Sequence, residues 1–130
     1  MKKSVEVKIG EKSYSLMFDT KALAVAERSI GRSLVFMLGQ VVMNPAMGNA
    51  INIDFTVACL NASLQDKPKD FDPYNFIDDY CEAGGTLDEL NAHIFEAIVA
   101  SGLFTKGDSK TTEKAIETYR KVLIPLESKV

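Results

Sequence analysis

Three carboxylates lie close together in the sequence, at Asp78, Asp79 and Glu82. Paired carboxylates can exchange protons with a substrate or bind a divalent cation. The surrounding pattern lacks the parts that either chemistry needs, because no histidine is close by and no D-x-D-x-D-G calcium loop is present. We interpret the three side chains as a solvated acidic helix face, and we keep a metal- or nucleotide-dependent enzyme as an alternative.

The cysteines and the histidine are too scattered to predict a metal site. Cys59 and Cys81 each lie in an apolar helical pattern, and there is no second pair to build a disulfide framework. A structural zinc ion needs about four ligands, and His93 is the only histidine. We expect two reduced thiols in a cytoplasmic protein and a structural, partly exposed His93.

Signature motifs of nucleotide and acyl chemistry are missing from the chain: G-x-x-x-x-G-K, G-x-G-x-x-G and G-x-S-x-G do not occur. A formal net charge of -3 disfavours nucleic-acid binding through bulk positive charge. The longest apolar stretch, residues 34–43, is half of the roughly 20 residues that a membrane helix needs. We therefore expect no enzymatic activity, no cofactor, no nucleic acid and no membrane.

Charge is unevenly distributed along the 130 residues. Residues 1–32 carry a net charge of +3, residues 33–105 a net charge of -8, and residues 106–130 a net charge of +2. This asymmetry favours complementary packing between copies of the chain or with a partner. An ordinary solvated surface with uneven charge is the alternative.

The elements that position these residues follow from periodicity. Apolar residues alternate with polar ones in Val5–Ile9 and again in Tyr14–Phe18, which predicts a β-hairpin over residues 4–18 with a three-residue turn at Gly10–Lys12. Helical spacing dominates the rest. The expected fold class is α+β, mostly α, with the hairpin packed on a compact bundle of about five to six short helices.

Capping residues mark where these helices begin and end. Asp19 or Thr20 can cap the first helix, and Gly31 is suited to end it. Asp54 is expected to cap a third helix, Asp72-Pro73 to start a fourth, and Thr86 with Glu89 to form the capping box of a fifth. We expect one globular domain over residues 1–104, followed by an amphipathic helix within 105–130 that is either docked or mobile.

Two segments carry more apolar surface than one core face needs. The segment 34–43 is apolar all round, and the segment 112–126 has an apolar stripe suited to a groove. We expect self-association or partner binding through these segments, and the alternative is that both simply complete the core. The residues of this candidate surface are Leu34, Phe36, Met37, Val41, Ile116, Tyr119 and Leu123.

The order of these motifs resembles the tail assembly chaperones of long-tailed bacteriophages, including those of prophages and gene transfer agents. A β entry ends in the aromatic-Asp pair Phe18-Asp19, and a helix with an "ALxxxE" pattern, Ala22 to Glu27, then ends at Gly31. Further matching steps are Leu60–Leu64 before Asp66-Lys67-Pro68, Phe76–Asp79 before Gly85–Leu90, and Glu96–Ile98. The resemblance covers residues 5–104, although residues 40–52 are longer and more apolar than the usual connection.

The resemblance implies a non-enzymatic assembly factor in the cytoplasm of the bacterial host. Such proteins coat the long helical tape measure protein, keep it soluble, help to bring tail tube protein to it, and are absent from the finished particle. Independently of the resemblance, the apolar segment 34–43 predicts a homo-oligomer. The alternative of another class is a minor structural protein, a connector or tail component, that stays in the particle.

Overall fold

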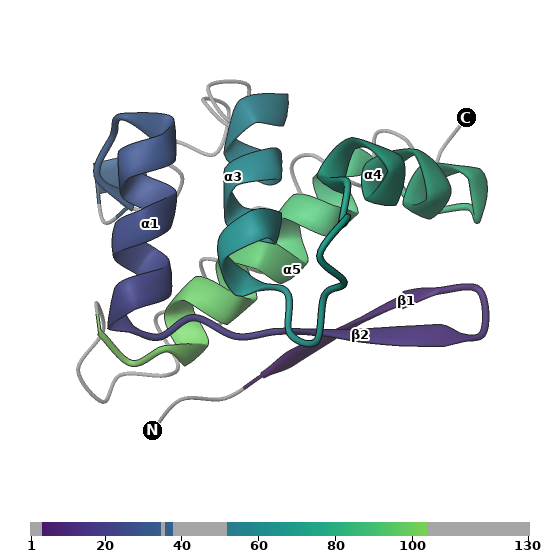
Figure 1. Cartoon of the computed structure of the whole chain (residues 1–130), viewed down its shortest axis with the longest axis horizontal. Helices are drawn as coiled ribbons and strands as arrows, with labels where there is room; N and C mark the ends of the chain where they lie inside the picture. Colours follow the sequence, from purple (N-terminus) through teal and green to yellow (C-terminus); the bar gives the residue numbers. More distant parts are fainter. Residues whose placement is uncertain (1–3, 35, 38–51, 104–130) are drawn as a thin grey trace.

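The computed structural model describes residues 4–34, 36–37 and 52–103, and contains a two-stranded antiparallel hairpin and a set of helices (Figure 1). The bounded elements are β1 (Val5–Ile9), β2 (Lys12–Leu16), α1 (Thr20–Ile30), α3 (Ile53–Ser63), α4 (Pro73–Glu82) and α5 (Leu87–Ala100). The expected class, mostly α with an N-terminal hairpin, is confirmed. The described residues hold four helices with assigned bounds rather than the expected five to six, and the segments 38–51 and 104–130 lie outside the described residues.

The hairpin turn is one residue shorter than the sequence predicted. Ile9 pairs with Lys12, so Lys12 belongs to β2 and the connection is Gly10-Glu11 alone. Gly10 has a φ of 61°, which glycine adopts without the steric cost that a Cβ would bring. The turn needs a positive φ at its first central residue, as two-residue hairpin turns of type II′ do.

The outer edge of β2 is covered by the backbone that follows α3. Met17 N donates to Ser63 O at 2.9 Å, and Gln65 N donates to Ser15 O at 2.9 Å. Leu64 therefore forms an antiparallel bridge with Leu16. These bonds satisfy backbone groups that an open strand edge would leave exposed, and they tie the hairpin to the end of α3.

Caps at α1 agree with the sequence, whereas the start of α3 does not. Asp19 accepts a hydrogen bond from Ala22 N at 2.7 Å, and Gly31 ends α1 with a φ of 76°. At α3 the capping residue is Asn52, which accepts from Phe55 N at 3.0 Å. The predicted cap, Asp54, lies inside the first helical turn, where a carboxylate favours the positive end of the helix dipole.

The starts of α4 and α5 follow their predicted signals. Asp72 accepts from Tyr74 N at 2.9 Å, with Pro73 at the first helical position. Thr86 Oγ1 accepts from Glu89 N at 3.1 Å and caps α5. Between the two helices, a Cβ added at Gly85 would collide with the ring of Tyr80, so the backbone passes too close to this ring for a side chain.

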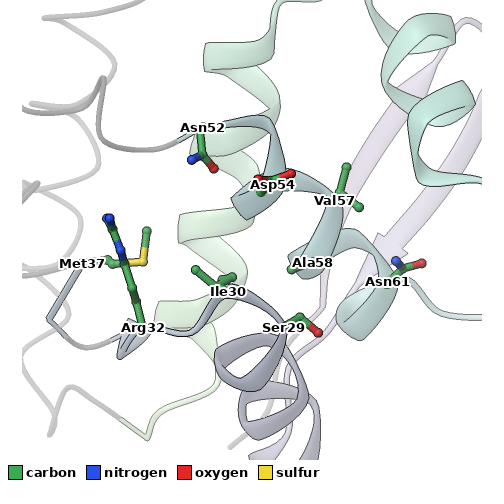
Figure 2. A pocket seen from close by; sticks show the side chains of 9 residues that line it. All are labelled: Ser29, Ile30, Arg32, Met37, Asn52, Asp54, Val57, Ala58 and Asn61. Carbon is green, nitrogen blue, oxygen red and sulfur yellow. The ribbon is translucent and has the colours of Figure 1, made fainter.

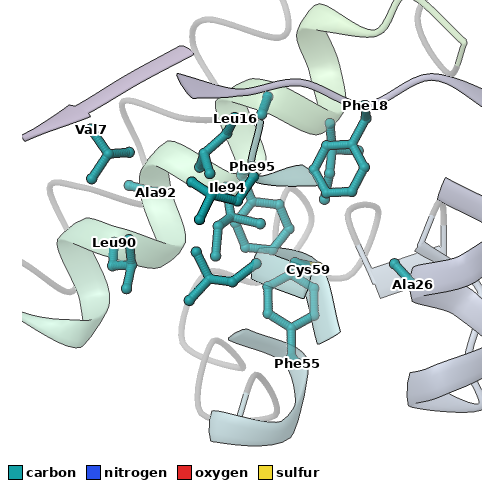
Figure 3. Close-up of a cluster of buried hydrophobic side chains, with 14 of the residues drawn as sticks. Val7, Leu16, Phe18, Ala26, Phe55, Cys59, Leu90, Ala92, Ile94 and Phe95 are labelled. Atoms are coloured by element: carbon teal, nitrogen blue, oxygen red, sulfur yellow. The ribbon is translucent and has the colours of Figure 1, made fainter. Parts of the chain in front are cut away.

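The hydrophobic core lies between the hairpin and the helices, with α3 and α5 crossing at its centre (Figures 1 and 3). Phe55 of α3 stacks on Phe95 of α5 with ring centroids 5.4 Å apart. Burial extends around much of α5, and the buried residues are Leu90, Asn91, Ala92, Ile94, Phe95, Ala97 and Ile98.

Removing the α5 cap tests the contribution of the predicted helix start. We expect Thr86→Ala to lower the free energy of unfolding by about 1 kcal/mol, because the Glu89 N–H loses its side-chain acceptor. Urea unfolding followed by circular dichroism measures the change. The matched control is Thr20→Ala, at an exposed position one residue after the α1 cap, which should change stability by less than about 0.5 kcal/mol. Equal effects of the two substitutions would contradict the assignment.

Candidate interaction surface

The segment after α1 begins with two side-chain caps. Glu27 Oε2 accepts a hydrogen bond from Leu34 N at 2.8 Å, across seven residues of chain. Ser33 Oγ accepts from Phe36 N at 3.3 Å. The Glu27 side chain therefore connects the last turns of α1 to Leu34 and fixes the direction of the chain after α1.

The three described residues of the predicted contact segment divide between core and surface. Leu34 is 1% exposed and Met37 is 4% exposed, whereas Phe36 is 62% exposed. Residues three apart share a helix face, so Leu34 and Met37 point into the core together while Phe36 points away. The alternative that this segment completes the core holds for Leu34 and Met37, and their assignment to an open contact surface is corrected. Phe36 remains accessible to a partner.

The other members of the predicted surface are Val41, Ile116, Tyr119 and Leu123, which lie outside the described residues. Their assignment to a contact surface stays a prediction. The same holds for the domain boundary near residue 104 and for the C-terminal helix within 105–130.

A hollow of about 310 Å³ lies between the end of α1 and the start of α3 (Figure 2). Ile30, Met37, Val57 and Ala58 supply its apolar lining. Its polar lining comes from Ser29, Arg32, Asn52, Asp54 and Asn61.

A second hollow, of about 300 Å³, lies beside the other half of the same helix pair. The first half of α1 lines it through Lys21, Ala22 and Val25. Asn61 of α3 lines both hollows. We call the two together the α1/α3 groove, because they succeed one another along the antiparallel pair of helices.

The titratable residues do not converge on a reactive site. Asp78, Asp79 and Glu82 are exposed on α4, and His93 is half-buried on α5. Within the described ranges, no group of three or more His, Cys, Asp or Glu side chains is placed to hold a metal ion. No described helix is long and apolar enough to cross a membrane.

Sequence reasoning missed a buried polar contact between α3 and α5. Thr56 Oγ1 donates to Asn91 Oδ1 at 2.6 Å, and neither residue is more than 1% exposed. The sequence signal was weak, because α3 and α5 carry other polar residues as well, such as Asn61 and His93. Because an unmet polar group in the core would be costly, the pair fixes how α3 and α5 lie against each other.

The two cysteines differ in their surroundings. Cys59 is buried in the core and Cys81 is exposed on α4. Burial raises the pKa of the Cys59 thiol well above its ordinary value, since the thiolate would lose its hydration. Cys59 is therefore an inert core residue at neutral pH.

Substitutions at neighbouring positions separate core from surface in the segment after α1. We expect Met37→Ala to lower the free energy of unfolding by about 2–5 kcal/mol, because it removes a buried side chain. Phe36→Ala should change it by less than about 0.5 kcal/mol, since the ring is mostly exposed. Chemical denaturation of both variants decides the matter. A large loss for Phe36→Ala with none for Met37→Ala would reverse the assignment.

Alkylation kinetics test the burial of Cys59. In a Cys81→Ser chain, iodoacetamide at pH 8 should label Cys59 about 100-fold more slowly in the native state than in denaturant, because reaction requires the core to open. Mass spectrometry of timed samples gives both rates. The Cys59→Ser chain is the control, and its exposed Cys81 should react rapidly in the native state. Comparable native rates in the two chains would contradict the placement of Cys59.

In comparisons with known proteins, no protein-family model, no curated protein and no solved structure matches this chain.

Proposed function

We propose that this protein is a tail assembly chaperone of a long-tailed phage or prophage. In this role it binds along the tape measure protein in the host cytoplasm without catalysing a reaction. It keeps that long helical partner soluble and helps to recruit tail tube protein.

The observation that carries the proposal is where the motif residues of the resemblance lie. Phe18 is fully buried, Asp19 caps α1, Glu27 accepts from Leu34 N, and Gly31 ends α1 in the left-handed conformation. Thr86, from the later matching step, caps α5. The residues that carry the resemblance are therefore ones that cap, end and fill the elements of this fold, and the proposal rests on these positions.

A chaperone for a long helical partner needs apolar surface that is not buried in its own core. Phe36 is 62% exposed and Ile53 is 51% exposed, and each is next to a residue that lines the hollow between α1 and α3. Two large exposed apolar side chains beside one hollow supply apolar area for a partner that enters it. We therefore assign Phe36 as the contact residue to test first.

Co-expression with the tape measure protein encoded by the same genome tests the function. We expect the tape measure protein to be recovered in the soluble fraction, bound to this chain, and to be insoluble when expressed alone. Phe36→Ser should reduce the recovered complex about tenfold, because an exposed aromatic anchor contributes strongly to binding. Leu103→Ser is the matched control, since Leu103 is similarly exposed but distant in sequence, and it should leave recovery unchanged.

Two outcomes would contradict the proposal. One is the absence of a complex together with no gain in solubility of the tape measure protein. The other is the presence of this chain in purified mature particles, measured by mass spectrometry, which would favour the minor structural protein instead.

A further inference from the structure

The α1/α3 groove has the dimensions of a helix-binding site. Its two hollows follow α1 and α3, each of which has 11 residues and is therefore about 16 Å long at 1.5 Å per residue. Met17 and Val25 add apolar surface to one hollow, and Ile30 and Val57 to the other. The apolar lining residues are buried or half-buried and most of the polar ones are exposed, so polar groups form the rim. A groove of this mixed character between two antiparallel helices can accept a third helix along it.

The rim of this groove carries more positive than negative charge that is open to a partner. Lys21, Arg32 and Lys67 line it, against Asp19 and Asp54. Asp19 is already engaged as the α1 cap, and Lys67 Nζ donates to Asn61 O, which leaves Lys21 and Arg32 against Asp54. Lys21 and Arg32 form no ion pair with another described residue.

The outward face of α4 carries negative charge, opposite in sign to Lys21 and Arg32 of the groove. Asp78, Asp79 and Glu82 are exposed along it, and the helix contains no basic residue. Within the described chain these three carboxylates form no ion pair. Tyr74, 56% exposed, adds one large ring to the same helix, while Phe76 and Tyr80 point into the core.

The geometry points to a second copy of this chain as the occupant, and we propose that its α4 docks in the α1/α3 groove. The α4 of the same chain cannot reach this groove, because α3 stands between α1 and α4 (Figure 1). With 10 residues, α4 is about 15 Å long and matches the length of the groove. The acidic residues of α4 then meet Lys21 and Arg32, and Tyr74 covers apolar lining.

This contact joins two different surfaces, so each docked copy leaves one groove and one α4 face open. Such head-to-tail contacts close into a ring, of which a reciprocal two-fold dimer is the smallest, or continue as an open row. The inference does not depend on the proposed function, because self-association is measured on this chain alone. It can fail while tape measure binding succeeds, and the reverse is equally detectable.

Sedimentation velocity over a concentration series tests the interface with the full chain. We expect reversible association at about 50 mM salt that weakens at about 500 mM, because the contact depends on charge pairs that salt screens. Lys21→Glu with Arg32→Glu should raise the dissociation constant about 100-fold, and Asp78→Lys with Asp79→Lys should do the same. The chain that carries all four reversals should regain association to within about tenfold of the original chain, because the charges are again opposite.

Controls separate the interface from net charge and from folding. Lys8→Glu with Lys12→Glu changes the net charge as much as the groove variant does, on the exposed hairpin, and should leave the dissociation constant unchanged within about threefold. Circular dichroism confirms that each variant is folded. Tyr74→Ser gives a test without charge reversal, and it should raise the dissociation constant about tenfold.

Three results would overturn the proposal. The first is a strict monomer for the original chain at every concentration, which would leave the groove to another protein. The second is unchanged association in the groove, α4 and Tyr74 variants. The third is failure of the four-reversal chain to regain association although it is folded.

Discussion

The crossing of α3 over α5 is the contact on which the remaining elements depend. Phe55 stacks on Phe95, and Thr56 donates to Asn91 inside the same contact. Apolar packing brings the two helices together without specifying their alignment, whereas a buried hydrogen bond is satisfied in only one arrangement. Once α3 and α5 are aligned, α1 packs against α3, α4 follows at the other side, and the hairpin lies across α5 (Figure 1).

The hairpin depends on this helical core as much as it contributes to it. Two strands alone are marginally stable in water, and here β2 obtains hydrogen bonds on its second edge from residues 63–65 at the end of α3. Val7, Leu16 and Phe18 then close one side of the core. The strand pair and the helix pair therefore stabilise each other, which fits cooperative folding of the described residues as one unit.

The surface has two kinds of feature that fit a binding protein. Exposed Phe36 and Ile53 offer apolar contact area, and the α1/α3 groove and the α4 face carry opposite charge on different sides of the same small fold. Binding along an extended partner and packing of neighbouring copies make different demands on a surface. Phe36 and Ile53 are next to residues that line one hollow of the α1/α3 groove, so the two proposed contacts adjoin one another on this fold.

Local sequence determined much of the secondary structure, because caps and turns act over a few residues. Asp19, Gly31, Pro73 and Thr86 mark element ends through hydrogen bonds or backbone angles that depend on their immediate neighbours. Competition between adjacent signals explains the misplaced start of α3, where both Asn52 and Asp54 can cap a helix. The same limit explains the turn at Gly10-Glu11, whose length depends on which residues pair across the hairpin.

Only the tertiary structure decided which apolar residues are core and which are open to a partner. In the sequence, all three described residues of the segment after α1 are large and apolar: Leu34, Phe36 and Met37. In the structure, the hydrogen bond from Leu34 N to Glu27 fixes this segment so that Leu34 and Met37 are buried and Phe36 is exposed. The Thr56–Asn91 bond and the α1/α3 groove likewise join residues far apart in the chain. Hydrophobic periodicity shows which face of a helix is apolar but not which element packs against that face. The packing partner is decided only when the helices come together in the tertiary structure.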